Sequence, residues 1–104
     1  MLNISVCTLN VHGLRDSTKC KNVITWLNVF AFDFVLLQET HLRNSDFDNF
    51  KRRWNGQVFF SSAPSNHSSG VAIACSKRIN CSFSQVREDN EGRFISVLGD
   101  IFIK

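Results

Sequence analysis

Several residue types are missing or scarce in this chain of 104 residues, which has no tyrosine and only one proline. No apolar run reaches the roughly 18 residues that a membrane-spanning helix needs, so we expect no membrane partner. Residues 1–5 contain neither a basic stretch nor a long apolar one, so a secretory signal is not expected. We therefore predict an intracellular protein that is not secreted.

Closely spaced cysteine pairs are also lacking. Zinc sites commonly use Cys-x-x-Cys pairs, and none occurs, so we do not expect zinc. The even cysteine count invites a disulfide interpretation, but no secretory signal supports it. We predict free thiols that are buried or half-buried as small hydrophobic side chains, in a reducing compartment. The cysteines are Cys7, Cys20, Cys75 and Cys81.

Length and composition are those of one globular domain. Hydrophobic residues make up 43% of the chain and charged residues 20%, which argues against disorder. A chain of this size has room for one domain and not for two. The net charge of +3 is compatible with an anionic partner but does not by itself indicate one.

The first part of the chain predicts a strand, a helix and a second strand. Residues 2–9 alternate with period two, which is typical of a strand. A helix capped by Asp16 or Ser17 follows, with Cys20, Val23, Ile24, Leu27 and Phe30 on one apolar stripe. The continuous apolar run at 34–37 favours a strand buried on both faces. Such a unit places its two strands parallel and adjacent.

The remainder predicts one short helix and several strands. The helix covers residues 47–54, and Arg87 to Gly92 form a charged turn. We expect a bulge or turn at Gly99-Asp100 in the last strand. The expected strands are 58–60, 70–75, 81–86 and 93–104, with a polar loop at 61–69.

Two polar residues follow the parallel strands directly. Asn10 comes after the first apolar strand and Glu39 after the second, so both are expected at one edge of the sheet, where ligands bind in such folds. A carboxylate beside an amide supplies the hard oxygen ligands that suit Mg²⁺. The pattern alone leaves open that these are merely polar residues that close two strands.

Four segments carry a family resemblance. They are Thr8-Leu9-Asn10-Val11-His12-Gly13-Leu14, Leu36-Leu37-Gln38-Glu39-Thr40-His41-Leu42, Gly70-Val71-Ala72-Ile73 and Glu91-Gly92-Arg93-Phe94-Ile95. In this order they resemble the endonuclease/exonuclease/phosphatase superfamily. That superfamily includes apurinic endonucleases, exodeoxyribonuclease III and the endonuclease domains of non-long-terminal-repeat retrotransposons. The retrotransposon branch fits best, because Leu-Asn-Val-x-Gly-Leu and Gln-Glu-Thr-His-Leu occur together.

The resemblance implies roles for the matching residues. Glu39 matches the metal-binding glutamate, and Asn10 matches the asparagine beside the metal and the reactive phosphate. The implied ion is Mg²⁺, with Mn²⁺ as a substitute. His12 is assigned no metal role; it is either a phosphate contact or a solvated loop residue. Arg15 is either a DNA phosphate contact or a solvent-facing side chain.

The fold implied is a DNase I-like four-layer α/β sandwich, in which two mixed β-sheets are flanked by helices. The family's chains are about twice as long, and their later half supplies a tyrosine, an Asp-x-Asn pair and a closing Asp-His pair. We therefore expect residues 1–104 to be a partial domain, truncated on the C-terminal side. His41 is not the family's catalytic histidine and is expected to organise the loop after Glu39.

The function implied is Mg²⁺-dependent hydrolysis of phosphodiester bonds in DNA, in the nucleus, by the complete domain. This chain is then expected to be a truncated and inactive copy, whose partner would be the DNA phosphate backbone. Two alternatives stay open. The domain could act on another phosphate ester, or the chain could be a non-catalytic remnant or interaction fragment.

Overall fold

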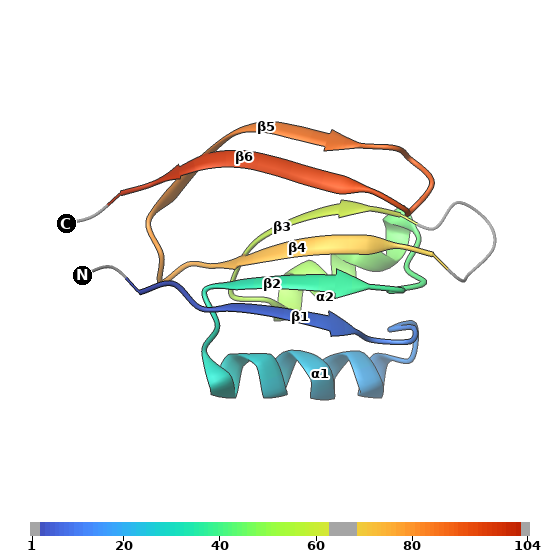
Figure 1. The fold of residues 1–104 in the computed structure, drawn as a ribbon. Coiled ribbons are helices and arrows are strands. Elements are labelled where there is room, and N and C mark those ends of the chain that lie inside the picture. The colour runs from blue at the N-terminus through green and yellow to red at the C-terminus, as the bar shows by residue number, and fades with distance from the viewer. Residues whose placement is uncertain (1–2, 63–68, 103–104) are drawn as a thin grey trace.

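Two β-sheets and two α-helices form the computed structural model, which describes residues 3–62 and 69–102 (Figure 1). Residues 63–68 of the expected polar loop lie outside that description. The elements are β1 (Val6–Asn10), α1 (Ser17–Phe30), β2 (Phe34–Gln38), a 3₁₀ turn η1 (Asn44–Asp46), α2 (Phe47–Arg53), β3 (Gly56–Ser61), β4 (Val71–Ser76), β5 (Cys81–Glu88) and β6 (Ile95–Ile101).

The predicted strand–helix–strand unit is confirmed. Strands β1 and β2 are parallel neighbours, and their last residues, Asn10 and Gln38, lie opposite each other. Strand β1 begins at Val6, later than the alternation predicts. Just before Val6, the carbonyl of Ser5 still accepts from the backbone nitrogen of Phe34 at 3.1 Å, but its backbone nitrogen donates to a carboxylate oxygen of Asp33 at 3.0 Å instead of to a strand.

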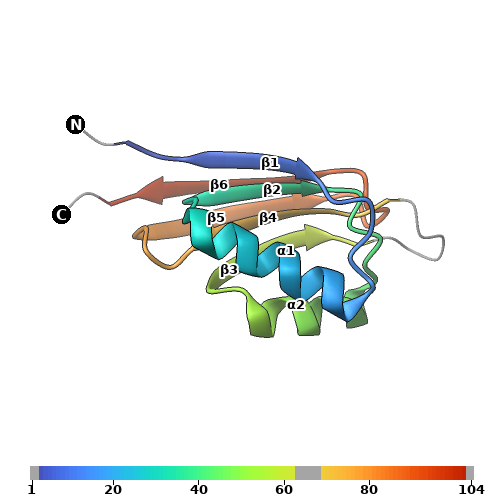
Figure 2. The same cartoon turned by 90° about the horizontal axis from the view of Figure 1, so that it is seen from below.

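The first sheet has the strand order β1-β2-β4-β3, with β4 antiparallel to both of its neighbours. Both helices lie on one face of this sheet (Figure 2). Buried side chains between the sheet and the helices form the core, because each element turns an apolar face inwards. These side chains include Val35, Leu37, Ala72 and Ala74 from the strands and Ile24, Leu27, Phe47 and Phe50 from the helices.

Helix α1 begins and ends at residues that satisfy its free backbone groups. The Asp16 carboxylate accepts bonds from the backbone nitrogens of Thr18 and Lys19 at 2.9 and 3.0 Å, which confirms it as the cap. The helix ends where Ala31 turns left-handed, with a φ of 56°. Contrary to the predicted stripe, Phe30 is 57% exposed, and its ring packs against that of Trp26, which is itself 46% exposed, with centroids 4.7 Å apart.

The hairpin β5–β6 forms the second sheet and covers part of the other face of the first. Rings of Phe59 and Phe83 meet edge to face across the two sheets, with centroids 4.9 Å apart. The expectation that β2 is buried on both faces is wrong, because the hairpin covers only part of this face and Leu36 is left half-buried. The bulge expected at Gly99-Asp100 in the last strand is not there: the irregularity lies on the partner strand β5, between Phe83 and Gln85, opposite the Leu98–Gly99 step.

All four cysteines are free thiols, as predicted. Cys20 and Cys75 are buried, and Cys7 and Cys81 are half-buried. Burial raises the pKa of Cys75 to about 12, and the Cys81 thiol beside it acts in the same direction. Within the described ranges, no helix has the length and apolar character to cross a membrane.

Candidate functional site

Asn10 and Glu39 lie side by side at the carboxyl ends of β1 and β2. Asn10 is the last residue of β1, and Glu39 follows the last residue of β2. The side-chain nitrogen Nδ2 of Asn10 donates a hydrogen bond to Oε2 of Glu39. The structure therefore brings together the two residues that the sequence singles out.

Backbone pairing continues past both strands and fixes this approach. The backbone nitrogen of Gly13 donates to the carbonyl of Glu39 at 2.7 Å, and that of Leu14 donates to the carbonyl of Thr40 at 2.8 Å. Glu39 itself is left-handed, with a φ of 51°, and His41 also has a positive φ, of 59°. Left-handed backbone is costly for residues other than glycine and tends to occur at functional sites.

The loop after Glu39 is held on its other side by the segment before β4. The backbone nitrogen of Thr40 donates to the carbonyl of Gly70 at 3.0 Å, and that of His41 donates to the carbonyl of Ser69 at 2.8 Å. A side-chain carbon on Gly70 would lie 2.3 Å from the hydroxyl oxygen of Thr40. Only glycine therefore permits this close approach, which buries Thr40 completely.

The amide of Asn10 holds the carboxylate in place by making two hydrogen bonds. Its oxygen Oδ1 accepts from the backbone nitrogen of His12 at 3.1 Å, while its nitrogen faces Glu39. The second oxygen of Glu39, Oε1, lies 3.9 Å from Nε2 of His41. Among the described residues, Nε2 of His41 has no hydrogen-bond partner, although it is buried.

These groups fit a hydrated divalent cation. Oε1 of Glu39 is a hard oxygen on a side chain that is 43% exposed, so it can be reached from solvent. Mg²⁺ commonly binds through one or two carboxylates and keeps several waters, and carboxylate oxygen and water suit Mn²⁺ as well. In the described part of the chain, no group of three or more His, Cys, Asp or Glu side chains could hold a metal. The chain's own residues therefore supply a sparse ligand set.

The other two predicted residues lie close to this pair. His12 is exposed and has a φ of 49°. The guanidinium nitrogen Nε of Arg15 donates to the carbonyl of His41 at 3.0 Å and lies 4.0 Å from a carboxylate oxygen of Asp46. Arg15 thus braces the loop that carries Glu39. The backbone hydrogen bond from Arg43, more than the charge of Arg15, lowers the pKa of Asp46.

Sequence reasoning missed the parts that Lys19, Thr40 and Gly70 play here. Lys19 lies in the first turn of α1, where the helix dipole disfavours a cation. Its ammonium donates to the carbonyl of His12 at 3.1 Å, which explains its place. The one signal in the sequence was Gly70, which precedes an apolar strand. A glycine at such a position often marks a site where another segment of backbone comes close, here the loop after Glu39.

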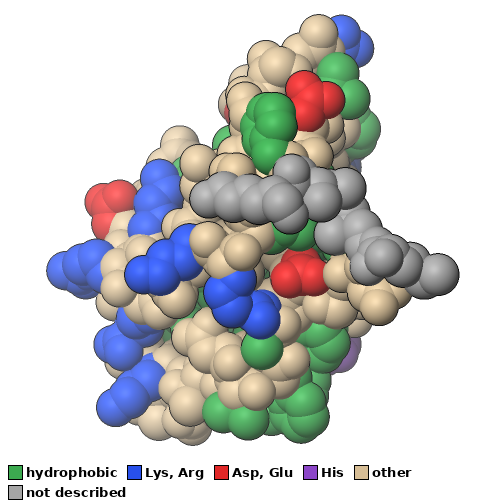
Figure 3. Space-filling view, turned by 90° about the vertical axis from the view of Figure 1, so that its left-hand side faces the viewer, with side chains coloured by type: hydrophobic (Ala, Val, Ile, Leu, Met, Phe, Trp, Pro, Cys, Tyr) green, Lys and Arg blue, Asp and Glu red, His purple; other side chains and the backbone are tan. Residues whose placement is uncertain are grey.

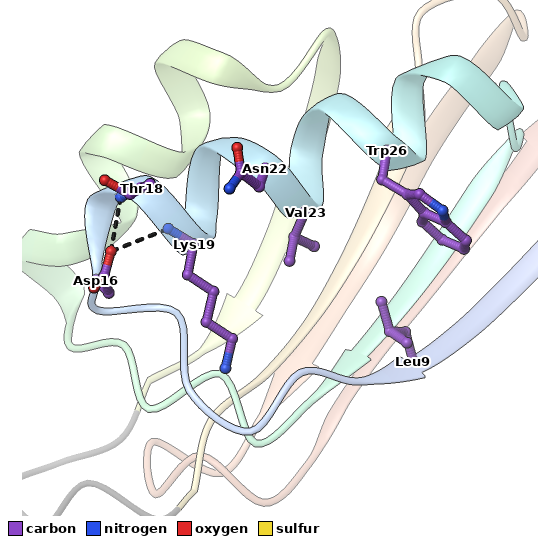
Figure 4. A pocket seen from close by; sticks show the side chains of 7 residues that line it. All are labelled: Leu9, Asp16, Thr18, Lys19, Asn22, Val23 and Trp26. Carbon is purple, nitrogen blue, oxygen red and sulfur yellow. Dashed lines mark hydrogen bonds between the residues drawn. The ribbon is translucent and has the colours of Figure 1, made fainter.

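A hollow of about 520 Å³ opens between β1 and α1 (Figure 4). Apolar side chains of Leu9, Val23 and Trp26 make up much of its wall, with Lys19 and Asn22 beside them. Neither Asn10 nor Glu39 lines it. Because the paired amide and carboxylate lie outside this hollow, we place the functional site at the strand ends.

Together, the parallel β1–α1–β2 unit, the second sheet and the polar pair at the strand ends define a two-sheet α/β domain with a ligand site at its edge. Residues 7–103 match the model of the endonuclease/exonuclease/phosphatase family, and the chain belongs to that family. The fold is consistent with the N-terminal part of a DNase I-like α/β fold. The family hydrolyses phosphoester bonds and is generally metal-dependent.

Proposed function

We propose that the site at the ends of β1 and β2 serves Mg²⁺-dependent hydrolysis of a phosphodiester bond in DNA. The observation that carries this proposal is the hydrogen bond from Asn10 to Glu39, which fixes a solvent-accessible carboxylate in a family of phosphoester hydrolases. Mn²⁺ is the expected substitute ion. The nucleus is the expected compartment.

Each residue has a distinct part in this proposal. Glu39 would hold the ion through Oε1, and Asn10 would keep the carboxylate aimed at the sheet edge, where the phosphate would lie. A bound divalent cation supplies electrostatic stabilisation of the charge that develops on a phosphate oxygen. His12 and Arg15 stand on the same edge, and we propose them as contacts to neighbouring phosphates.

DNA is the substrate that the motifs favour. Residues 8–14 and 36–42 resemble the retrotransposon endonucleases more than other branches of the family. By the resemblance, the base that activates water would come from a second half of the domain. We therefore propose that the complete domain cuts DNA, whereas residues 1–104 alone bind the ion without cutting.

Metal binding by this chain tests the assignment of Glu39. In a titration with Mn²⁺ followed by electron paramagnetic resonance, the parent chain is expected to bind weakly and Glu39→Gln to lose that binding. The matched control is Glu88→Gln, which removes the same charge from an exposed position on β5. Equal Mn²⁺ binding by Glu39→Gln and the parent would show that Glu39 is not the ligand.

Substrate choice needs a separate assay on the full-length gene product. We expect it to nick supercoiled plasmid DNA with Mg²⁺ and to release no phosphate from inositol phosphates. Preferential hydrolysis of inositol phosphates would favour the phosphatase alternative. Hydrolysis of neither, with normal Mn²⁺ binding, would favour a non-catalytic remnant.

A further inference from the structure

Cations gather at the end of the molecule opposite the candidate site. The last turn of α2 carries Lys51, Arg52 and Arg53, and the turn after β4 carries Lys77 and Arg78. Figure 3 looks onto this end and shows lysine and arginine side chains grouped there. The group combines two segments that are separated in the sequence.

Tertiary contacts hold these two segments together. The indole nitrogen of Trp54 donates to the carbonyl of Cys75 at 3.2 Å, and the backbone nitrogen of Lys77 donates to the carbonyl of Asn55 at 3.1 Å. A side-chain carbon on Gly56 would lie 1.9 Å from the same Cys75 carbonyl. The end of α2 is thus packed directly on the end of β4, so the cations are fixed to a rigid base.

A groove runs between β3 and β5 beside these cations. It consists of two adjoining hollows of about 390 and 630 Å³, which share Gly56, Gln57, Cys81 and Phe83 as walls. Lys77, Arg78 and Asn80 line the first hollow, and Lys51 lines the second. We call this feature the basic groove, defined by Lys51, Gln57, Lys77, Arg78, Asn80 and Phe83.

The positive charge of the basic groove is largely uncompensated. Within residues 3–62 and 69–102, the carboxylate paired with a cation of the groove is that of Asp33, 3.9 Å from Arg78. No described carboxylate forms an ion pair with Lys51 or Lys77. Both lysines are exposed, and the ammonium of Lys51 lies 4.9 Å from the centroid of the Phe60 ring, a contact that involves no anion.

The basic groove is distinct from the site at Glu39. The end of β4 that bears the groove pairs with the start of β2, where Cys75 lies opposite Phe34. Glu39 follows the other end of β2. A strand of this length spans about 17 Å, so a ligand in the groove does not touch the metal ligands.

We propose that the basic groove binds the phosphate backbone of a nucleic acid. Lys51 and Lys77 supply point charges for phosphates, and the amides of Gln57 and Asn80 supply further donors. A recessed polar groove suits a polyanionic chain better than a membrane surface, into which exposed apolar side chains would insert. The choice of nucleic acid among polyanions rests on the DNA substrate proposed above. The charge and shape of the groove are independent of that proposal.

Binding of labelled oligonucleotides tests the proposal. Fluorescence anisotropy of single-stranded and duplex 20-mers is measured in EDTA, so that no metal-dependent reaction contributes. We expect Lys51→Gln with Lys77→Gln to weaken binding roughly ten-fold at 0.1 M salt and to reduce the salt slope of log K by about 1.5. The matched control, Lys21→Gln with Arg87→Gln, removes the same charge from exposed positions outside the groove.

The possible results separate the explanations. Selective weakening in the groove variant, with the control unchanged, supports the proposal. Equal weakening in both variants would show a general charge effect and overturn it. So would tighter binding to vesicles containing phosphatidylserine than to either oligonucleotide, or no oligonucleotide binding. Because Glu39→Gln leaves the groove intact, normal oligonucleotide binding by that variant separates a failure of the hydrolytic site from a failure of the groove.

Discussion

The side-chain amide of Asn10 links the ends of two parallel strands by donating to the carboxylate of Glu39 and accepting from the backbone nitrogen of His12. Asn10 thus orients the carboxylate, while Oε1 of Glu39 stays available at the surface. The sequence pattern offers both residues as oxygen ligands for Mg²⁺, whereas the hydrogen bonds of Asn10 give the two residues different parts. Glu39 is the proposed metal ligand, and Asn10 positions it.

Asn10→Asp should make the site depend on a divalent cation. The substitution replaces the N–H donor with a second negative charge beside Glu39, and two adjacent carboxylates repel each other. In EDTA at neutral pH, we expect the free energy of unfolding to fall by about 1 kcal/mol. Added Mg²⁺ should raise the melting temperature of this variant more than that of the parent. Asn22→Asp, at an exposed position of α1, is the control for charge alone.

The left-handed backbone at Glu39 predicts an unusual order of stabilities. A side chain at a φ of 51° costs about 1 kcal/mol, which glycine avoids. Glu39→Gly should therefore be more stable to urea than Glu39→Ala by about that amount. At Gln38, which is in extended strand, the order should reverse, because glycine weakens a strand. Equal stabilities of the two Glu39 variants would argue that the carboxylate contacts impose the left-handed backbone.

The proximity of Asn10 and Glu39 could be predicted because it follows from local patterns. Alternation, a capped helix and an apolar run define a parallel unit, and the ends of adjacent parallel strands share an edge. The left-handed turn at Glu39 could not be predicted in this way. It depends on a backbone hydrogen bond from Gly13 and on contacts with Gly70. Both glycines are distant from Glu39 in the sequence, so these interactions leave no periodic signal.

The apolar alternation of β1 also shows a limit of pattern reasoning. It indicates two faces without saying what covers each one. In the structure, Cys7 and Leu9 pack against the core, whereas Val6, on the other face, is 57% exposed. The basic groove was similarly hidden, because Lys51 and Lys77 come together only through the packing of α2 on β4.

Asp89 should make stability depend on acid pH. Partial desolvation raises the pKa of its carboxyl, but the backbone hydrogen bond to Glu91, the Ser61 hydroxyl and the Arg93 contacts outweigh it and hold the pKa well below its usual range. A lowered native pKa gives stability above the unfolded value of about 3.9, and that stability is lost as pH falls through the native pKa. Urea midpoints from pH 7 down to pH 2 should show the loss.

Asp89→Asn should remove that part of the acid dependence and lower stability at neutral pH. Its matched control is Asp48→Asn, at an exposed position of α2. If the Asp89→Asn and parent midpoints fell in parallel with decreasing pH, Asp89 would not be the group responsible.

Gly70→Ala tests how the loop that carries Glu39 is supported. The new methyl group would overlap the hydroxyl of Thr40, and a φ of 111° disfavours any side chain, so we expect a loss of about 2 kcal/mol in the free energy of unfolding. Combining Gly70→Ala with Thr40→Ala should cost less than the sum of the single changes, because the clash is removed. Thr40→Ser keeps the hydroxyl and should give no such relief. If the costs were additive in both double variants, with Thr40→Ala and with Thr40→Ser, the whole effect would come from the backbone conformation of Gly70. A steric clash with Thr40 would then be excluded.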